Sequence, residues 1–423
     1  MSIHVVSAGQ TVSSIAAQYG VSPVTLARLN ELPPGGELAV GQALVVQFPT
    51  QTHTVAPGET LFGIARRYGV TVRSLYRNNF FLHGQSALRP GEELTVSLRA
   101  PTGNALTVGG YAYPSISRGL LDQQLPYLTD LMPFTYGVTP EGTLLPPADE
   151  ALLTASRRQQ AQPRMSLSTL TADGGFSRDD AAAVLTDPER TERLVQAVAD
   201  AVLHRDYAGA DVDFEYLGRE LSQPFAAFIT SLRRRLAPSG KTVWVALPPK
   251  TGDDQPGQLY EGHDYAALGA AADAVLLMTY EWGYTYSGPR AVAPLPQVEQ
   301  VLRYALSRIP AEKLLLGLPT YGYAWELPYR EGTAARSLSP QEAVALARTS
   351  GAAIRYDETA QSPWFRCRIG GTEHEVWFED ARSAQAKLTL VGRYGLRGVG
   401  LWNLMRLFPQ LCLLLNQQFA DEM

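Results

Sequence analysis

The 423-residue sequence predicts an α/β protein whose main part is a (β/α)8 TIM barrel, preceded by two small βααβ modules. Three observations lead to this prediction. Residues 4–30 are repeated at 53–79, the rest of the chain alternates apolar runs with amphipathic stretches, and one gap between runs is long enough for a small insertion. A chain of this length also exceeds what one compact core usually needs, so several domains are expected.

Composition and charge narrow the class of protein. With 45% hydrophobic and 18% charged residues and a mean hydropathy of −0.10, the chain is neither disordered nor fibrous. No apolar run approaches the roughly 18 residues of a membrane-spanning helix, so no membrane partner is predicted. The net charge of −5 and the lack of a basic patch argue against nucleic acid as a partner.

Neither a metal centre nor a disulfide framework is predicted. The only cysteines are Cys367 and Cys412, and no His, Asp and Glu residues follow metal-ligand spacing. We therefore expect no cofactor. The first ten residues lack a basic segment followed by an apolar stretch, so no classical signal peptide is expected.

The two N-terminal modules are a sequence repeat. Shifting residues 4–30 by 49 positions onto 53–79 gives 12 identities in 27 positions. Each copy predicts a short strand, a glycine turn, two helices and a closing strand, with Thr11 or Thr60 as the N-cap of the first helix. Two copies make independent modules, because a solenoid needs more repeats to bury its core.

Both copies resemble the LysM domain through the pattern V-x-x-G-[QE]-T-[VL] followed by I-A-x-x-Y-G-V. The resemblance covers 3–48 and 52–97. It implies binding of glycans that contain N-acetylglucosamine, such as peptidoglycan or chitin, in a groove between two loops. A structural repeat used only for assembly is the alternative. The residues that the resemblance assigns to glycan binding are Gly9, Thr11, Asn30, Gly58, Thr60 and Asn79.

Eight apolar runs after residue 104 predict the barrel strands, and amphipathic stretches at 187–203, 224–236 and 296–309 predict helices between them. Most runs start about 25 to 45 residues apart, which suits one βα unit. The runs lie at 106–111, 131–136, 165–170, 210–214, 242–247, 274–280, 314–321 and 399–404.

The gap between the seventh and eighth runs is too long for one βα unit. It contains a helix-like stretch at 339–349 and strand-like stretches at 352–356 and 373–379, which predict a small α+β insertion on the barrel rim. The expected domains are 1–49, 50–98 and a barrel over 99–423 that contains the insertion in 325–390.

The fourth predicted strand carries the strongest functional signal. Side chains alternate along a strand, so Asp211, Asp213 and Glu215 share one face while Val212 and Phe214 share the other. Three carboxyls on the inner face of a barrel are costly to bury unless they are protonated or hydrogen-bonded. Such crowding pushes pKa values apart and can keep one acid protonated near neutral pH, as general acid catalysis requires. A solvated edge strand with acidic turn residues is the alternative.

This strand resembles the D-x-x-D-x-D-x-E signature of the family-18 glycoside hydrolases, and the resemblance extends over 105–415. Residues 277–283, Leu-Met-Thr-Tyr-Glu-Trp-Gly, resemble the family's sixth-strand motif, and Trp402 stands at the place of its eighth-strand tryptophan. Together with two LysM copies, these motifs look closest to the spore-germination subgroup, the cortical-fragment lytic N-acetylglucosaminidases.

The resemblance implies a role for each catalytic residue. Glu215 is the general acid and base, and Asp213 orients the substrate acetamido group and stabilises an oxazolinium ion. Asp211 partners Asp213, and Tyr280 holds the acetyl oxygen. The substrate's own acetamido group is then the nucleophile, an exception to the usual two-carboxylate scheme, and the β configuration is retained. Substrate-binding residues are expected at Trp402, Tyr111, Tyr136, Met278 and Glu281.

One position departs from the signature. Ala208 replaces its first Asp, while Gly209 is retained. In the family that Asp holds the middle Asp of the signature, so the proton shared between Asp211 and Asp213 is expected to sit differently. We expect catalysis to persist with an altered pH optimum.

Other aromatic residues and two histidines are weaker candidates. Sugar contacts and core packing are equally suitable roles for Tyr111, Phe134 and Tyr136. Outer subsites could be lined by Tyr284, Tyr286 and Trp325. We expect His263 and His374 to pack against other residues or to lie in loops.

The resemblance implies a monomeric, spore-associated glycosidase that cleaves N-acetylglucosaminidic bonds of cortex peptidoglycan. A chitinase or chitooligosaccharide hydrolase with the same active site is one alternative. A catalytically weak spore-coat lectin is another, although the presence of both Glu215 and Asp213 argues against it.

Overall fold

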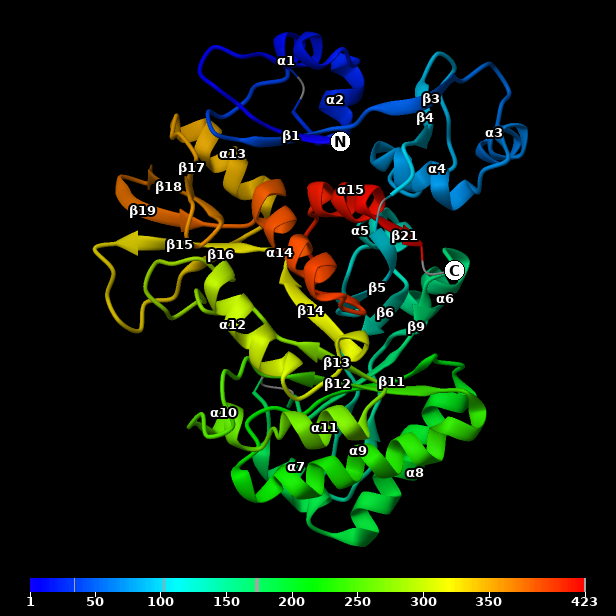
Figure 1. Ribbon diagram of the computed structural model, residues 1–423, viewed down its shortest axis with the longest axis vertical. Helices are drawn as coiled ribbons and strands as arrows, with labels where there is room; N and C mark the ends of the chain where they lie inside the picture. The colour runs from blue at the N-terminus through cyan, green and yellow to red at the C-terminus, as the bar shows by residue number, and fades with distance from the viewer. Residues whose placement is uncertain (34, 102, 172–174, 422–423) are drawn as a thin grey trace.

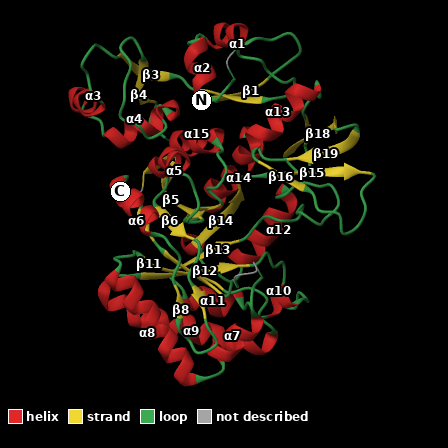
Figure 2. Ribbon diagram, turned by 180° about the vertical axis from the view of Figure 1, so that it is seen from behind, coloured by secondary structure: helices red, strands yellow, loops and turns green. Residues whose placement is uncertain are grey.

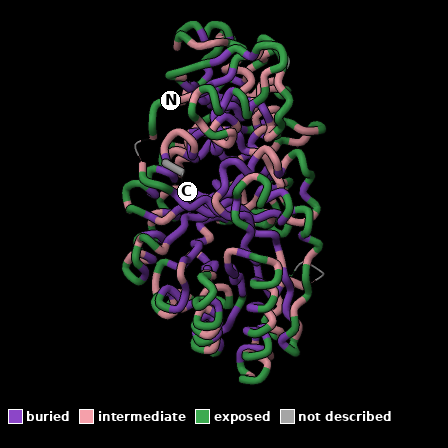
Figure 3. The backbone as a smooth tube through the Cα atoms, turned by 90° about the vertical axis from the view of Figure 1, so that its right-hand side faces the viewer, coloured by how far each residue is buried: buried purple, intermediate pink, exposed green. Residues whose placement is uncertain are grey.

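The computed structural model describes residues 1–33, 35–101, 103–171 and 175–421. Two small modules lie at one end of the molecule, and a barrel with a rim insertion makes up the rest (Figure 1). Helices surround the strands of the barrel (Figure 2), and the buried backbone concentrates in its interior (Figure 3). Within the described residues, no helix is long and apolar enough to cross a membrane.

Each module is a pair of antiparallel strands with two short helices between them, as the repeat predicts. Thr11 and Thr60 are N-caps whose hydroxyls accept hydrogen bonds from the amides of Ser14 and Gly63, so both predicted caps are confirmed. The elements are β1 Ser2–Val5, α1 Val12–Tyr19, α2 Pro23–Leu29 and β2 Ala43–Val46, then β3 Pro49–Thr54, α3 Leu61–Tyr68, α4 Val72–Asn78, η1 Phe80–Leu82 and β4 Glu93–Leu98.

The barrel contains eight parallel strand positions, which confirms the predicted (β/α)8 architecture. The third position is interrupted at Arg164: its first part pairs with β6 and its second part with β11, and together they close the sheet. A last strand, β21 Phe419–Asp421, adds to the start of β5. The barrel strands are β5 Gly103–Ala112, β6 Asp130–Pro133, β9 Gln162–Pro163 with β10 Met165–Ser168, β11 Gly209–Asp213, β12 Thr242–Leu247, β13 Ala274–Leu277, β14 Leu314–Pro319 and β20 Gly398–Trp402.

The barrel helices form from amphipathic stretches, and several of them begin at a side-chain cap. Asp187 accepts hydrogen bonds from the amides of Glu189 and Arg190, and Pro188 occupies the first turn of the longest of them. A two-stranded ribbon, β7 Gly137–Val138 and β8 Leu144–Leu145, follows β6. The helices are α5 Arg118–Gln124, η2 Leu125–Tyr127, α6 Glu150–Arg158, α7 Arg178–Leu185, α8 Pro188–His204, η3 Arg219–Leu221, α9 Ser222–Leu236, η4 Ala237–Ser239, α10 Gln258–Glu261, α11 Tyr265–Ala271, α12 Leu295–Leu306, η5 Ala311–Lys313, α14 Ala381–Tyr394 and α15 Pro409–Gln418.

The insertion between the seventh and eighth strands is a five-stranded antiparallel sheet with one helix, which confirms an α+β unit but with more strands than predicted. The strands that were not predicted are β15, which begins three residues after β14 ends and just beyond the apolar run at 314–321, β16 and β18. The strand expected at 352–356 begins later. The elements are β15 Gly322–Leu327, β16 Arg336–Leu338, α13 Pro340–Ser350, β17 Arg355–Asp357, β18 Ser362–Ile369 and β19 Thr372–Trp377.

Both modules pack firmly onto the barrel and its insertion. Arg73 of α4 donates four hydrogen bonds to barrel carbonyls, those of Pro126, Leu128, Gln159 and Gln160, at 2.6–3.2 Å. The first module touches the insertion through the amide of Ile354, which donates to the carbonyl of Val40 at 2.8 Å. Four apolar residues of the modules also belong to the main hydrophobic core: Leu29, Ala43, Val45 and Phe80.

Candidate active site

The carboxylate strand β11 divides its side chains between two environments, as its alternation predicts. Phe214, just beyond the strand, stacks on Phe225 and Phe228 of α9 with ring centroids 5.6 and 5.8 Å apart. Asp211 and Asp213 point the other way, into the barrel, and are 0% and 5% exposed. The apolar face thus anchors the strand on the helices and fixes the direction of the carboxyls.

Asp211 and Asp213 form a buried pair of carboxyl groups with few hydrogen bonds. The hydroxyl of Tyr111 donates to Oδ2 of Asp211 at 2.8 Å, while Oδ1 of each aspartate is buried and finds no hydrogen-bond partner among the described residues. Burial raises the pKa of Asp211 to about 6, opposed by the Tyr111 hydrogen bond and the charge of Arg164. The pKa of Asp213 is raised well above its usual range by burial and then by the charges of Glu215 and Asp211. The pair therefore holds a proton near neutral pH.

Glu215 follows the strand end and reaches into the cleft. Burial raises its pKa to about 7, and the negative charge of Glu281 adds to the rise. A carboxyl with this pKa is protonated for part of the time at neutral pH and ionises readily. It therefore has the properties of a group that first donates and then accepts a proton.

Tyr280 and Glu281 follow the sixth strand β13. The ring of Tyr280 fits because Gly317 on β14 has no side chain: a Cβ there would lie 2.8 Å from Tyr280 Cε1. Burial, followed by the charges of Asp213 and Glu215, raises the pKa of Tyr280 well above its usual range, so its hydroxyl stays a donor. Glu281 accepts hydrogen bonds from the hydroxyls of Tyr321 and, at 3.2 Å, Tyr323.

Two residues of the site adopt strained backbone conformations. Tyr216, directly after Glu215, has φ of 57°, and Glu281, directly after Tyr280, has φ of 69°. Left-handed conformations are costly for residues other than glycine, and they concentrate at functional sites because a rigid fold can impose them there. Both turns direct a side chain into the cleft.

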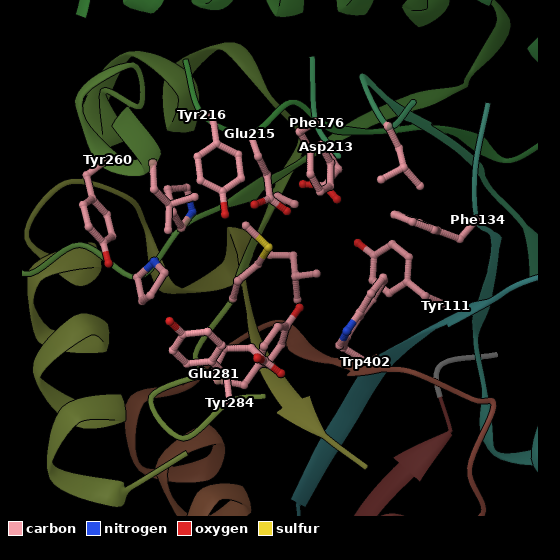
Figure 4. Close-up of a pocket in the computed structure, with 18 of the residues that line it drawn as sticks. Tyr111, Phe134, Phe176, Asp213, Glu215, Tyr216, Tyr260, Glu281, Tyr284 and Trp402 are labelled. Atoms are coloured by element: carbon pink, nitrogen blue, oxygen red, sulfur yellow. The ribbon is translucent and has the colours of Figure 1, made fainter. Parts of the chain in front are cut away.

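The cleft has a volume of about 590 Å³ and largely aromatic walls. Trp402, at the end of β20, packs edge to face against Phe134 at 4.9 Å and Tyr111 at 5.5 Å. Figure 4 shows Asp213 and Glu215 on one side of the cleft and Trp402 and Glu281 on the other. Flat rings beside acidic groups suit a sugar, whose apolar face stacks on a ring while its hydroxyl and amide groups meet polar atoms.

Most of the predicted site residues line this cleft, and the exceptions are Asp211 and Tyr136. Asp211 lies beneath the cleft floor as the partner of Tyr111. Tyr136 does not line the cleft; it belongs to the main core, and its hydroxyl lies 3.3 Å from that of Tyr207. The predicted residues that line the cleft are Asp213, Glu215, Tyr280, Trp402, Tyr111, Met278 and Glu281.

The weaker candidates divide similarly. Phe134 and Tyr284 line the cleft, Tyr286 lies exposed beside Tyr284, and Trp325 is buried. Both histidines make structural contacts: His263 Nε2 donates to the carbonyl of Phe214 at 2.9 Å, and His374 Nδ1 donates to that of Thr372 at 3.0 Å.

Several cleft residues were not predicted. Tyr216 and Trp282 adjoin predicted residues, so sequence proximity was an available signal. Tyr113, Phe176 and Tyr260 lie in the connections after three different strands, Tyr260 within the short helix α10, and nothing in their local sequence distinguishes them from packing aromatics. Their role emerges only once the barrel brings the strand ends together.

A buried ion pair lies near the position of the missing signature acid. Arg164 donates to Oδ1 of Asp130 at 2.9 and 3.0 Å, and its guanidinium lies 3.8 Å from the ring centroid of Trp244. Its positive charge lowers the pKa of Asp211, opposite to the effect of burial. With alanine at position 208, the groups that lower the pKa of Asp211 are therefore the hydroxyl of Tyr111 and the guanidinium of Arg164.

In the modules, the predicted glycan-binding residues form turns, helix caps and hydrogen bonds to the backbone. Gly9 and Gly58 adopt φ of 81° and 83° in the turns before α1 and α3. The side chains of Asn30 and Asn79 are buried and bridge backbone groups; Asn30, for example, bonds to Leu26 and Val45. Glycan binding by these residues stays a prediction. The asparagine side chains are occupied by backbone groups, so for Asn30 and Asn79 the prediction applies to the loops that they hold in place.

Comparison with known proteins agrees with this geometry over the whole chain. A cortical fragment-lytic enzyme of Bacillus subtilis (strain 168) is 38% identical over 99% of this chain and 98% of its own. The crystal structure of the Bacillus megaterium QM B1551 spore cortex-lytic enzyme SleL superimposes with a TM-score of 0.84 at 33% identity, covering 100% of this chain and 99% of the other. A chitinase from Chromobacterium violaceum ATCC 12472 matches 74% of this chain and 99% of its own, with a TM-score of 0.68 and 29% identity.

The family profiles match the same parts of the chain. The LysM domain matches residues 4–47 and 53–97, which cover the two modules. Glycosyl hydrolases family 18 matches residues 153–406, which include the carboxylate strand and most of the cleft. The chain belongs to family 18 of the glycosyl hydrolases and is a glycosidase with two LysM domains.

Proposed function

We propose that this glycosidase cleaves N-acetylglucosaminidic bonds in the peptidoglycan of the spore cortex. The observation that carries the proposal is the pairing of Glu215, whose pKa burial raises to about 7, with Asp213 in an aromatic cleft. Similarity to cortical fragment-lytic enzymes along the full chain supports cortex as the substrate.

The proposed reaction begins with proton transfer from Glu215 to the glycosidic oxygen. The carbonyl oxygen of the substrate's 2-acetamido group attacks the anomeric carbon, the C–O bond to the leaving sugar breaks, and an oxazolinium ion forms. Water, deprotonated by Glu215, then opens this ion. Two inversions at one carbon leave the product in the original β configuration.

Asp213 and Tyr280 are assigned to the acetamido group. Asp213 must be ionised when positive charge develops on the amide nitrogen, so the proton of the aspartate pair has to reside on Asp211 at that moment. The pKa of about 6 for Asp211 supports such sharing. The protonated Tyr280 hydroxyl can donate to the acetyl oxygen and keep it aligned for attack. Glu215 and Asp213 provide both groups that the reaction requires, so we propose no cofactor.

The decisive experiment compares substrates. The protein is incubated with cortex fragments and with chitooligosaccharides, and the products are identified by mass spectrometry. Cleavage after N-acetylglucosamine in cortex fragments is expected to be the more efficient reaction. Preference for chitooligosaccharides would favour the chitinase alternative, which the match to a chitinase at 29% identity keeps open.

A second experiment tests the mechanism. NMR of the first-formed product should show the β-anomer, and a thiazoline analogue of the oxazolinium ion should inhibit. An initial α-anomer, or efficient turnover of a substrate that carries a 2-hydroxyl in place of the acetamido group, would contradict substrate assistance.

The LysM domains and the relatives support two further proposals. Two docked LysM domains are proposed to hold the enzyme on polymeric glycan, which raises the local concentration of bonds near the cleft. Association with the spore is proposed because the full-length relatives are named cortical fragment-lytic enzymes. A monomeric enzyme remains our expectation, which sedimentation analysis would test.

A further inference from the structure

A second large hollow lies between the second module and the barrel. It is a groove of about 620 Å³, with helix α4 and the segment at 84–87 on one side and helices α5 and α6 on the other. Gln159 and Gln160 line it and lie just before strand β9, at the amino end of the barrel. Glu215 follows the carboxyl end of β11, so the groove and the catalytic cleft lie at opposite ends of the barrel.

The groove has an excess of positive charge in a chain whose net charge is −5. Among the described residues that line it, three are arginines, Arg73, Arg118 and Arg158, and one is an acid, Asp122. Arg158 pairs with Oδ1 of Asp122 at 2.5 Å, and Nε of Arg118 lies 3.5 Å from Oδ2 of the same carboxylate. One carboxylate thus serves two guanidinium groups, and a local positive potential remains.

The three arginines differ in how many of their hydrogen-bond donors are used. Arg73 donates to four barrel carbonyls and so holds one wall of the groove in place. Within the part of the chain that the structure describes, Arg158 donates only to Asp122, and Arg118 makes only its ion pair. Their side chains are 43% and 75% exposed. Because a guanidinium carries five N–H donors, both can bind a further anionic group.

Close contact between the two walls fixes the shape of the groove. Gly84 has φ of 65°, and a Cβ there would collide with the carbonyl oxygen of Asp122, so the segment after α4 is pressed against α5. Burial raises the pKa of Tyr76, and the charges of Arg158 and Asp122 act on it as well, which places its hydroxyl near that ion pair. Gln85 contributes an amide to the same wall. Cations, a phenol and an amide are thus held at fixed positions, as recognition of a small polar ligand requires.

We propose that this groove is a binding site for the acidic peptide side chains of peptidoglycan, whose carboxylates pair with Arg118 and Arg158. The inference rests on the proposed function, because that function identifies the polymer. A planar guanidinium matches a carboxylate through two parallel hydrogen bonds. Three cations against one acid suit a short acidic peptide, whereas nucleic acid binding depends on many phosphate contacts.

The position of the groove supports a ligand carried by a glycan. Residues 84–87 belong to the loop after Asn79, one of the two loops that the LysM resemblance assigns to glycan binding. A peptide attached to a glycan at this module therefore lies within reach of the arginines. Since the catalytic cleft is at the other end of the barrel, the bound peptide belongs to a part of the polymer other than the bond being cleaved. Chitin carries no carboxylates, so the groove favours attachment to peptidoglycan over chitin.

Calorimetric titration of the full-length protein tests the site directly. The probe is the N-acetylated tripeptide L-Ala-γ-D-Glu-meso-diaminopimelate, and the same peptide with its carboxyls amidated should not bind. At low ionic strength, Arg118→Gln/Arg158→Gln should raise Kd for the acidic peptide by about tenfold or more, because two charge-assisted contacts are lost. Arg118→Gln alone changes a largely exposed side chain and should give a smaller rise in a protein that folds normally. Arg234→Gln, which removes an exposed arginine on α9, is the matched control and should bind like the wild type.

Co-sedimentation with the two polymers tests the consequence. The double variant should leave cortex peptidoglycan at lower salt than the wild type, while its retention on chitin and its turnover of chitooligosaccharides stay unchanged. The proposal would be overturned if the wild type failed to bind the acidic peptide, if the double variant bound it equally well, if the amidated peptide or inorganic polyphosphate bound as tightly, or if retention on both polymers fell equally. Cortex fragments left uncleaved by a protein that binds the peptide would instead count against the proposed function.

Discussion

Buried acids are handled in opposite ways in two regions of this molecule. On the helical wall of the barrel, Glu379 lies just before α14 and Lys387 lies within it, and their side chains are 2% and 1% exposed. Lys387 Nζ lies 2.8 Å from Glu379 Oε2, and the hydroxyl of Ser383 donates a further hydrogen bond to Glu379 at 2.6 Å. In the cleft, Asp213 and Glu215 are enclosed as well, yet no cation among the described residues pairs with either of them.

The difference distinguishes a charged pair that stabilises the fold from acids that take part in catalysis. A paired acid is compensated, so its removal mainly affects folding. Burial raises the pKa of Glu379 as well, but the charge of Lys387 and the hydrogen bonds from Lys387 and Ser383 oppose the rise. An enclosed acid without such partners destabilises the native state as pH rises, and a fold keeps such a group where chemistry requires it. The comparison therefore predicts loss of activity for substitutions in the cleft and loss of stability for those on the wall.

The largest expected effect follows Glu215→Gln. Glutamine has nearly the same shape but cannot donate a proton, so turnover of cortex fragments should fall by about three orders of magnitude or more while glycan binding persists. Because the pKa of Glu215 is raised from 4.5 to about 7, the wild type loses stability as pH increases through that range. Thermal unfolding at pH 8 should show the variant to be at least as stable as the wild type. Retention of more than about a tenth of the activity would show that another group is the acid.

The converse effect is expected on the wall. Lys387→Met leaves Glu379 buried without its cation and should lower the free energy of unfolding by about 3–5 kcal/mol, measured by urea denaturation. The matched control is the double variant Glu379→Gln/Lys387→Met, which removes both charges and should recover most of the loss. Active-site titration should show normal turnover per folded molecule. If the single and double variants are equally unstable, packing and not charge pairing is the cause.

A smaller effect should follow when the contact between modules and barrel is weakened. Arg73→Met removes four hydrogen bonds to barrel carbonyls, and it should cost about 1–3 kcal/mol and make residues 99–104 more sensitive to limited proteolysis. Arg66→Met, an exposed position at the end of α3, is the control and should change neither measurement. Equal behaviour of the two variants would mean that the apolar contact alone holds the modules.

The barrel and the catalytic strand could be predicted from the sequence for a physical reason. Apolar periodicity and the alternation of Asp211, Val212 and Asp213 are local properties, and the local pattern survives folding. It did not predict the docking of the modules, because Arg73 resembles any exposed helix arginine until the barrel carbonyls are in place. Nor did it predict Tyr260 or Arg164, whose positions depend on loops and strands far away in the chain.

The smallest expected effect concerns pH. Since Glu215 must be protonated to act as the acid, kcat/KM of the wild type should fall about tenfold per pH unit above about 7, the pKa to which burial and Glu281 raise this carboxyl. The charge of Glu281 contributes to that rise, so Glu281→Gln lowers the pKa of Glu215 and the descending limb should begin at lower pH. Glu281→Asp keeps the charge and should leave the limb closer to its wild-type position. Profiles are measured on a neutral chitooligosaccharide, whose own charge does not change with pH. A limb that stays in place in Glu281→Gln would show that burial alone sets the pKa of Glu215, and that the two carboxyls act independently despite facing one cleft.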